Sequence, residues 1–173
     1  MEPTIVAERP FLLVGLDFFG DPFALSGGWS EENEIGRLWK RFMAYLGANP
    51  QRLGHTTSDA VMYEVHVEHA ETAQTGEREV FVGLEVDRLE DVPVELVVKI
   101  LPAVPYAVFA LRGQEILSDW HQTIYRDWLP GSGYEAPYNY AVERYDERFK
   151  GVQQIAESML EVYIPIRRRA PGD

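Results

Sequence analysis

The stretch YAVERYDERF at 140–149 places one carboxylate, Glu143, in an aromatic setting. Tyr138, Tyr140 and Tyr145 surround it, on a segment with the composition of a β-strand. Electron-rich rings attract a cation by roughly 0.5–2 kcal/mol per contact, and a carboxylate adds the opposite charge. The pattern therefore predicts a site for a lipophilic cation or a planar aromatic compound.

The sequence is also compatible with two other roles for Glu143. On a solvated strand, Glu143 would form a surface ion pair with Arg144, Arg148 or Arg126. In a buried position its pKa would rise toward neutrality, and it could then act as a general acid or base. Glu161 on a neighbouring strand is compatible with a pair of carboxylates, although no spacing demands one.

The strands that carry these residues belong to a pattern that occurs twice. In each half we expect an apolar strand ending in glycine, then a helix, then two more strands. The expected strands are 9–20, 60–68 and 78–86 in the first half, and 104–113, 138–147 and 157–166 in the second, with one further strand at 94–102. The pattern predicts an α+β fold made of a duplicated strand–helix–strand–strand unit. Its antiparallel sheet would carry helices on one face and a ligand groove between the repeats.

The length of 173 residues suits one sizeable core, so we expect a single domain over 1–173. The two repeats would span about 4–87 and 94–167, with a tail at 168–173. A repeat of this length is far too long for a solenoid and indicates two units related by a pseudo-twofold axis. The three arginines at 167–169 should be solvated.

Helical periodicity predicts two helices that pack on the sheet. The first begins after an N-cap at Ser30 and ends near Gly47. The second runs over about 115–129 and stops at a Pro-Gly pair. Core packing is the main expectation for both apolar stripes, with the tryptophans Trp39 and Trp120 as the exceptions.

Alternation divides each strand into an aliphatic face and a face of aromatic, methionine and carboxylate side chains. The aliphatic faces are expected beneath the helices, which leaves the mixed faces free to form a pocket wall. Aligning the halves places 63–66 over 142–145, so Glu64 and Glu143 become equivalent positions on the mixed, helix-free face. The aliphatic faces comprise Val80, Val82, Leu84 and Val86, and Leu160, Val162, Ile164 and Ile166; the mixed faces include Phe81, Glu64, His66, Glu161 and Tyr163.

Composition excludes several classes of function. The net charge of −12 repels phosphate backbones, so we expect no direct nucleic-acid binding. The chain contains no cysteine, which removes disulfides, thiolate catalysis and cysteine-based zinc sites. The histidines show no metal-binding spacing; His66 and His69 lie three apart and would face opposite ways on a strand. No nucleotide-binding or nucleophile-elbow motif occurs, and we expect no metal and no cofactor.

Targeting signals are also missing from the sequence. The first residues lack a basic segment followed by an apolar run, and no stretch approaches the ~18 apolar residues of a membrane span. We therefore expect a soluble, cytoplasmic protein with no membrane contact.

Together, five motifs resemble the gyrase-inhibitor-like effector-binding domain of AraC- and MerR-type multidrug regulators. The resemblance covers essentially residues 4–167, and its more specific part is the Glu143-containing strand combined with the closing strand. The motifs are VGLDFFG (14–20), IGRLWKRF (35–42), WLPGSGY (128–134), VERYDERF (142–149) and LEVYIPI (160–166).

The resemblance implies that Glu143 reads a cationic or planar hydrophobic ligand. Matching pocket walls would be Tyr145, Tyr163, Trp39, Trp120 and Tyr106, to which the alternation adds Glu64, Phe81 and Glu161. The leading expectation is a stand-alone binding protein that senses or sequesters such compounds, since no separate DNA-binding domain is visible.

Two alternatives come with the same resemblance. Some stand-alone members look like hydrolases of reactive cyclopropane compounds, in which case Glu143 would be the base and Tyr145 its partner. Turnover of such a compound, abolished in Glu143→Gln, would distinguish this role from stoichiometric binding. Others act by binding a protein such as gyrase, so a protein partner is the second alternative.

Overall fold

The computed structural model describes residues 1–50 and 53–170. Six strands form a closed antiparallel barrel in the order β1-β3-β2-β6-β7-β4, which confirms the predicted antiparallel α+β fold. The strands are β1 (Thr4–Gly20), β2 (Met62–Glu68), β3 (Arg78–Glu85), β4 (Val97–Arg112), β6 (Tyr140–Tyr145) and β7 (Met159–Pro165). The order is symmetric between the two halves of the chain. The first half contributes β1, β3 and β2, and the second half contributes the equivalent strands β4, β7 and β6 in the reverse direction around the barrel.

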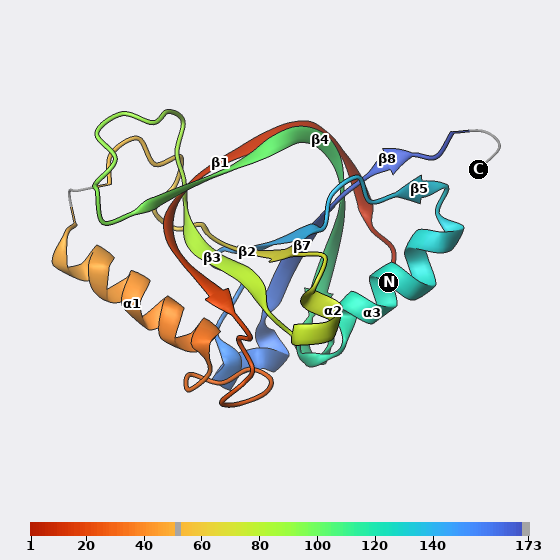
Figure 1. Ribbon diagram of the computed structural model, residues 1–173, viewed down its shortest axis with the longest axis horizontal. Helices are drawn as coiled ribbons and strands as arrows, with labels where there is room; N and C mark the ends of the chain where they lie inside the picture. The colour runs from red at the N-terminus through yellow and green to blue at the C-terminus, as the bar shows by residue number, and fades with distance from the viewer. Residues whose placement is uncertain (51–52, 171–173) are drawn as a thin grey trace.

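Two strands are longer than the sequence suggested. β1 begins at Thr4, and the segments expected at 94–102 and 104–113 join into the single strand β4. The pairing of β1 with β4 shifts register on both sides of Arg9, where β1 carries Pro10. Proline lacks a backbone donor and is tolerated in strands at such irregularities. With these bends β1 and β4 arch over the other four strands, and α1 and α3 lie on the far side of those strands (Figure 1).

The first helix, α1 (Glu34–Ala48), begins later than expected. Its N-cap is Asn33, whose side-chain oxygen accepts a hydrogen bond from the Gly36 amide at 2.9 Å, in place of the predicted Ser30. Asn49 is the C-cap, so Gly47 lies inside the last turn instead of following it. A short helix, α2 (Thr72–Thr75), connects β2 and β3.

The second predicted helix is interrupted. Ser118 is extended, and the Asp119 carboxylate accepts from the Gln122 amide at 3.0 Å, so a new helical segment starts there. The expectation of one continuous helix over 115–129 was therefore wrong. The segments are a 3₁₀ turn (Gly113–Leu117), α3 (Trp120–Gln122), a π turn (Thr123–Trp128) and a 3₁₀ turn (Leu129–Gly131); a further 3₁₀ turn spans Val152–Glu157.

The C-terminal arginines take part in the fold. Strand β8 (Arg167–Arg168) pairs with β5 (Tyr134–Glu135) in a two-stranded sheet. Arg167 forms an ion pair with Glu135 at 2.5 Å, and Arg169 donates to the Pro130 carbonyl at 3.1 Å. All three arginines are exposed, as expected, although they also make these contacts; residues 171–173 of the predicted tail lie outside the described residues.

Both faces of the sheet carry an apolar core. As predicted, the aliphatic faces lie under the helical segments: Val82 packs with Leu38 of α1, and Val162 packs with Ile124. The opposite face was expected to be free, but it forms the barrel interior beneath the β1–β4 arch. That second core contains Phe11, Leu13, Tyr63, Val65, Phe81, Tyr106, Tyr140 and Val142.

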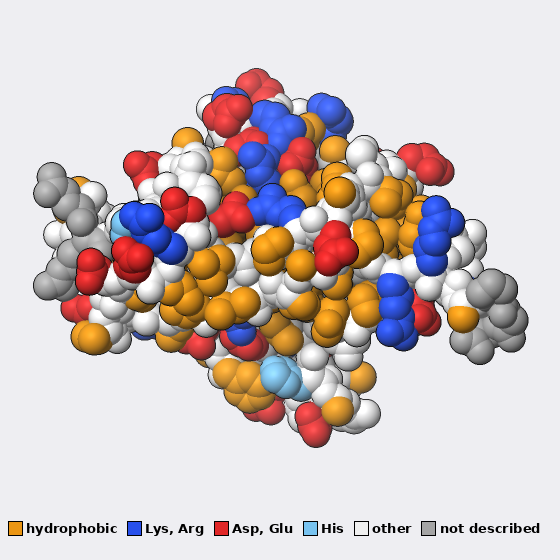
Figure 2. Space-filling model, turned by 90° about the horizontal axis from the view of Figure 1, so that it is seen from above, with side chains coloured by type: hydrophobic (Ala, Val, Ile, Leu, Met, Phe, Trp, Pro, Cys, Tyr) orange, Lys and Arg blue, Asp and Glu red, His pale blue; other side chains and the backbone are white. Residues whose placement is uncertain are grey.

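Figure 2 looks down on the outer face of this arch, where apolar side chains mix with charged side chains of both signs. Ile5, Val98 and Ile100 of β1 and β4 are among the exposed apolar residues. No helix formed by residues 1–50 and 53–170 has the length and hydropathy that a membrane crossing requires.

Barrel closure requires a close approach of β1 and β3, which is possible only without a side chain. Gly15 and Gly83 are partners in this pairing, and a Cβ on Gly15 would lie 1.9 Å from the Val82 carbonyl oxygen. We therefore expect Gly15→Ala to lower the free energy of unfolding by about 1–3 kcal/mol in urea titrations. The matched control Gly47→Ala, on an exposed part of α1 with open space around it, should raise that free energy by about 0.5–1 kcal/mol. An unchanged midpoint for Gly15→Ala would contradict the close approach.

Candidate functional site

Two glutamates lie opposite one another at the centre of the sheet. Glu64 of β2 and Glu143 of β6 are direct cross-strand partners, and each residue is buried, with 4% exposure. Glu64 also pairs with Val82, and Glu143 with Val162, so both glutamates share the face that carries the helices. The sequence prediction that they occupy a helix-free face was therefore wrong.

The glutamates remain reachable because the helical segments cover the two flanks of this face and leave its centre open. α1 and α3 stand on either side of the central strands (Figure 1). Between them lies a cavity of about 1360 Å³, whose wall includes Glu64 and Glu143. Its aromatic and methionine side chains are Phe23, Trp29, Trp39, Met43, Met62, Trp120, Tyr125, Tyr145 and Phe149.

Each carboxylate has one oxygen bound by an aromatic donor. The Trp39 indole Nε1 donates to Glu64 Oε2, and the Tyr145 hydroxyl donates to Glu143 Oε2. The other oxygens face His66, whose Nε2 lies 2.6 Å from Glu64 Oε1 and 3.7 Å from Glu143 Oε1. The surface ion pair with Arg144, Arg148 or Arg126 is thus not the role of Glu143.

Burial and mutual repulsion shift the ionisation of this group. Burial raises the pKa of Glu143 to about 7, and the charge of Glu64 adds to the rise, while His66 and the Tyr145 hydrogen bond oppose it. Burial acts to lower the pKa of His66, but its hydrogen bond to Glu64 and the charges of both glutamates outweigh that effect and raise it. Burial, followed by the charge of Glu143, raises the pKa of Tyr145 well above its usual value.

The structure divides the sequence-predicted site residues between the two faces of the sheet. Glu64, Glu143, Tyr145, Trp39 and Trp120 all line the cavity. The other four lie across the sheet, where Phe81 and Tyr106 belong to the barrel core, Tyr163 packs against it and Glu161 forms ion pairs. Their expected place in the same pocket was wrong, because barrel closure gives the second face a core of its own.

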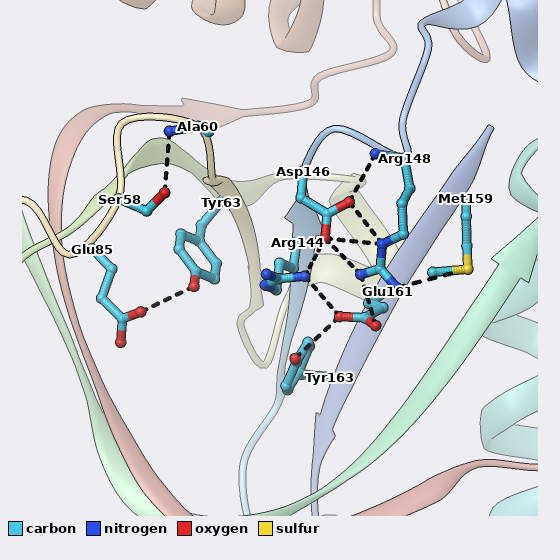
Figure 3. Close-up of polar contacts among 10 residues, drawn as sticks. All are labelled: Ser58, Ala60, Tyr63, Glu85, Arg144, Asp146, Arg148, Met159, Glu161 and Tyr163. Atoms are coloured by element: carbon cyan, nitrogen blue, oxygen red, sulfur yellow. Dashed lines mark hydrogen bonds and ion pairs between the residues drawn. The ribbon is translucent and has the colours of Figure 1, made fainter.

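Glu161 belongs to a polar cluster with Arg144, Arg148 and Tyr163 (Figure 3), and none of these residues lines the cavity. Glu161 lies opposite Arg144 in the β6–β7 pairing and contacts Arg144 at 3.0 Å and Arg148 at 2.9 Å. The Tyr163 hydroxyl donates to Glu161 Oε2 at 3.3 Å. A pair of Glu143 with Glu161 is therefore excluded by register, since adjacent positions on a strand face opposite ways.

Sequence reasoning undervalued His66. It follows Glu64 by two positions on one strand, which places both side chains on the same face. Alternation predicted that His66 shares the mixed face with Glu64, but the histidine spacing predicted no role for it. Trp29 and Phe149 were also missed; their rings lie 6.0 Å apart in the cavity wall, and no local pattern relates the loop before α1 to the segment after β6.

Comparison with known proteins agrees with this architecture. The model of the family described as integron-associated effector binding protein matches residues 4–166. The chain therefore belongs to this family, which confirms the resemblance to gyrase-inhibitor-like effector-binding domains.

Three known proteins are similar to this chain in sequence or in structure. The transcriptional regulator BrlR of Pseudomonas aeruginosa is 29% identical over 163 residues, which cover 93% of this chain and 54% of BrlR, so the chain spans about half the length of that relative. The structure of SAV2435 bound to tetraphenylphosphonium matches with a TM-score of 0.67 at 16% identity, covering 96% of this chain and 94% of SAV2435. An integron cassette protein from the mobile metagenome of Vibrio cholerae matches with a TM-score of 0.60 at 18% identity, covering 96% and 97%. The two structures show a shared fold.

The raised pKa of Glu143 predicts a pH-dependent stability difference. The folded protein binds the Glu143 proton more tightly than the unfolded chain, where the ordinary pKa is 4.5, so the stability that this group contributes falls as the pH rises from about 4.5 to about 7 and stays low above that. The glutamine in Glu143→Gln cannot ionise. At about pH 8 the free energy of unfolding of this variant should exceed that of the wild type by about 1–2 kcal/mol, and its melting temperature should be roughly 3–6 °C higher.

Thermal unfolding in the presence of a chelator, at about pH 5 and pH 8, measures this difference. The advantage of Glu143→Gln should be much smaller at the lower pH, which lies close to the unfolded pKa of 4.5, so that little of the stability has yet been lost. Glu68→Gln, two positions beyond His66 on the same strand, serves as the control and should follow the wild-type profile. A Glu143→Gln variant less stable than the wild type at pH 8 would show that the buried charge is compensated.

Proposed function

We propose that this chain is a binding domain for hydrophobic compounds that are cationic or planar, and that Glu64 and Glu143 read the positive charge. One observation carries the proposal: two buried carboxylates, directly opposite one another, line a cavity whose wall is rich in aromatic rings. Such a cavity provides flat apolar area for a ligand and an unlike charge at a fixed point.

The electrostatics of the group favour a cation. Two carboxylates face a single imidazole, so with His66 protonated and both glutamates ionised the buried group carries an excess negative charge. A buried excess charge is costly, and a cation placed beside it removes that cost. The net charge of −12 over the chain adds a long-range attraction for cations.

The size and lining of the cavity favour a bulky ligand. At about 1360 Å³ it exceeds the ~300–1,000 Å³ typical of small-molecule pockets. Trp39 and Tyr145 hold the carboxylates from one side, with their ring centroids 5.3 Å apart, and Trp120 lines the wall from the other half of the chain. A rigid cation with several aromatic rings fits this combination.

The comparisons support the same ligand class. SAV2435, which shares the fold, was solved with tetraphenylphosphonium, a lipophilic aromatic cation. BrlR is a transcriptional regulator, and this chain matches about half of its length. We therefore propose that the chain performs the effector-sensing or sequestering part of such a system; its negative charge argues against direct contact with nucleic acid.

Tetraphenylphosphonium is a suitable first probe for the proposal. We expect it to quench the tryptophan fluorescence of the wild type, because Trp29, Trp39 and Trp120 line the cavity. Glu143→Gln removes one of the two carboxylate charges and should weaken binding by roughly tenfold or more. The titrations are performed with a chelator present, so that metal ions do not contribute.

Glu161→Gln is the matched control for this titration. Glu161 and Tyr163 repeat the arrangement of Glu143 and Tyr145, with a tyrosine hydroxyl donating to a carboxylate two residues away, but on the opposite face of the sheet. A folded Glu161→Gln protein should bind the probe as the wild type does. No quenching in the wild type, or equal affinity in the wild type and Glu143→Gln, would rule out the proposed site.

The affinity for this probe should also depend on pH. Tetraphenylphosphonium has no titratable group, so any dependence belongs to the protein. A cation favours ionised Glu143, whose pKa burial raises to about 7, and unprotonated His66, whose pKa is also raised. Affinity should therefore rise between about pH 6 and pH 8, by up to about tenfold per pH unit for each proton released. A flat profile would show that the probe binds away from these groups.

A further inference from the structure

We propose that Glu64, His66 and Glu143 also form a binding site for a divalent transition metal ion, with Zn²⁺ as the best match. One ligand atom from each residue, Oε1 of either glutamate and the imidazole Nε2, lies within 4.8 Å of the other two. All three side chains point into the cavity from β2 and β6. This site is additional to the proposed binding of organic cations and does not depend on it.

The spacing of the three atoms suits a small ion. Ligands held about 2.0–2.2 Å from a tetrahedral Zn²⁺ lie about 3.4 Å from one another. His66 Nε2 is 2.6 Å from Glu64 Oε1 and 3.7 Å from Glu143 Oε1, so small side-chain rotations bring the atoms onto that geometry. The backbone already fixes the arrangement, because Glu64 and His66 share a strand face and Glu143 lies directly opposite Glu64.

Aromatic donors orient the carboxylates for this purpose. Trp39 binds Oε2 of Glu64, and Tyr145 binds Oε2 of Glu143, which leaves Oε1 of both residues directed at His66. Glu143 Oε1 is the notable atom: its side chain is 5% exposed, and its described polar contact is the imidazole at 3.7 Å. Outer hydrogen bonds of this kind are what orient ligands in known metal centres.

Charge and ligand type point to zinc among the divalent ions. Two carboxylates and a neutral imidazole carry two negative charges, which one divalent ion balances within a buried group. An imidazole ligand suits zinc and its neighbours, whereas calcium requires six to eight oxygens and magnesium retains most of its water. Three protein ligands leave a fourth position, and it would face the cavity, as in open zinc sites.

The two proposals predict competition, because a metal ion and an organic cation would use the same carboxylates. A bound Zn²⁺ removes the excess negative charge that attracts tetraphenylphosphonium, so saturating Zn²⁺ should weaken binding of the organic probe. The open fourth position would instead favour neutral or anionic ligands that can donate to the metal.

Cobalt titration of the full chain tests the site, because tetrahedral Co²⁺ has strong visible absorption while hydrated Co²⁺ has little. After treatment with a chelator and its removal, the wild type should bind one Co²⁺ per chain with this spectrum. Zn²⁺ should displace the Co²⁺ and Mg²⁺ should not. Each of Glu64→Gln, His66→Gln and Glu143→Gln should weaken Zn²⁺ binding by more than about tenfold in calorimetry.

Two residues of the cavity wall supply matched controls. Glu68 follows His66 by two positions on β2, and His121 lies 3.7 Å from Glu68, so both can attract metal ions without belonging to the group of three. Glu68→Gln and His121→Gln should bind Zn²⁺ within about twofold of the wild type. Far-UV circular dichroism and thermal unfolding confirm that each variant is folded.

The results separate the metal site from the organic-cation site. Absence of tetrahedral Co²⁺ absorption in the wild type, or equal Zn²⁺ affinity in the wild type and the three ligand variants, would overturn the metal site. Either result leaves the fluorescence titration in chelator unaffected. Conversely, if the wild type binds Zn²⁺ at these residues but does not bind tetraphenylphosphonium, the metal site is supported and the proposed function is ruled out.

Discussion

The repulsion between two buried carboxylates is the constraint around which the cavity is arranged. Glu64 and Glu143 are direct cross-strand partners, a placement that destabilises a sheet when both carry a charge, and burial increases the cost. Trp39, Tyr145 and His66 each direct a donor at one of them, which reduces the cost without removing it. An apolar pair at these positions would be expected to give a more stable sheet. The pair therefore makes physical sense as a group that a ligand completes.

This group can lie on the helix-covered face because the barrel supplies a separate core. β1 and β4 arch over the other strands and bury Phe11, Phe81 and Tyr106 between themselves and the sheet (Figure 1). Stability then does not require an apolar seal over the middle of the helix face. The centre of the helix-bearing face therefore lacks apolar packing and forms the cavity, while the barrel core remains complete.

The sequence allowed most of the strands and the first helix to be predicted, but not the face on which the site lies. Period-two alternation predicted the strands, and aligning the halves related Glu64 to Glu143, which the structure shows as partners. The error came from assuming that aromatic side chains mark a pocket and that every strand turns its more aliphatic face to the helices; β3 and β7 do, but β2 turns Tyr63 and Val65 into the barrel. Phe81 is aromatic because it fills the barrel, and that use depends on the β1–β4 pairing, a contact between segments about 100 residues apart. Cross-strand register, which places Glu143 beside Val162, was needed to choose the face.

The two Glu-x-Tyr sequences of this chain show why neighbours, and not the motif, determine a role. Glu143 and Glu161 each accept a hydrogen bond from the tyrosine two residues later. Glu161 also meets two arginines, Arg144 and Arg148, so its charge is satisfied within the protein (Figure 3). Glu143 instead shares one imidazole with a second carboxylate and lines a large cavity. Only the carboxylate that lacks a full complement of positive charge gains from binding a cation, and this difference locates the candidate site at Glu143.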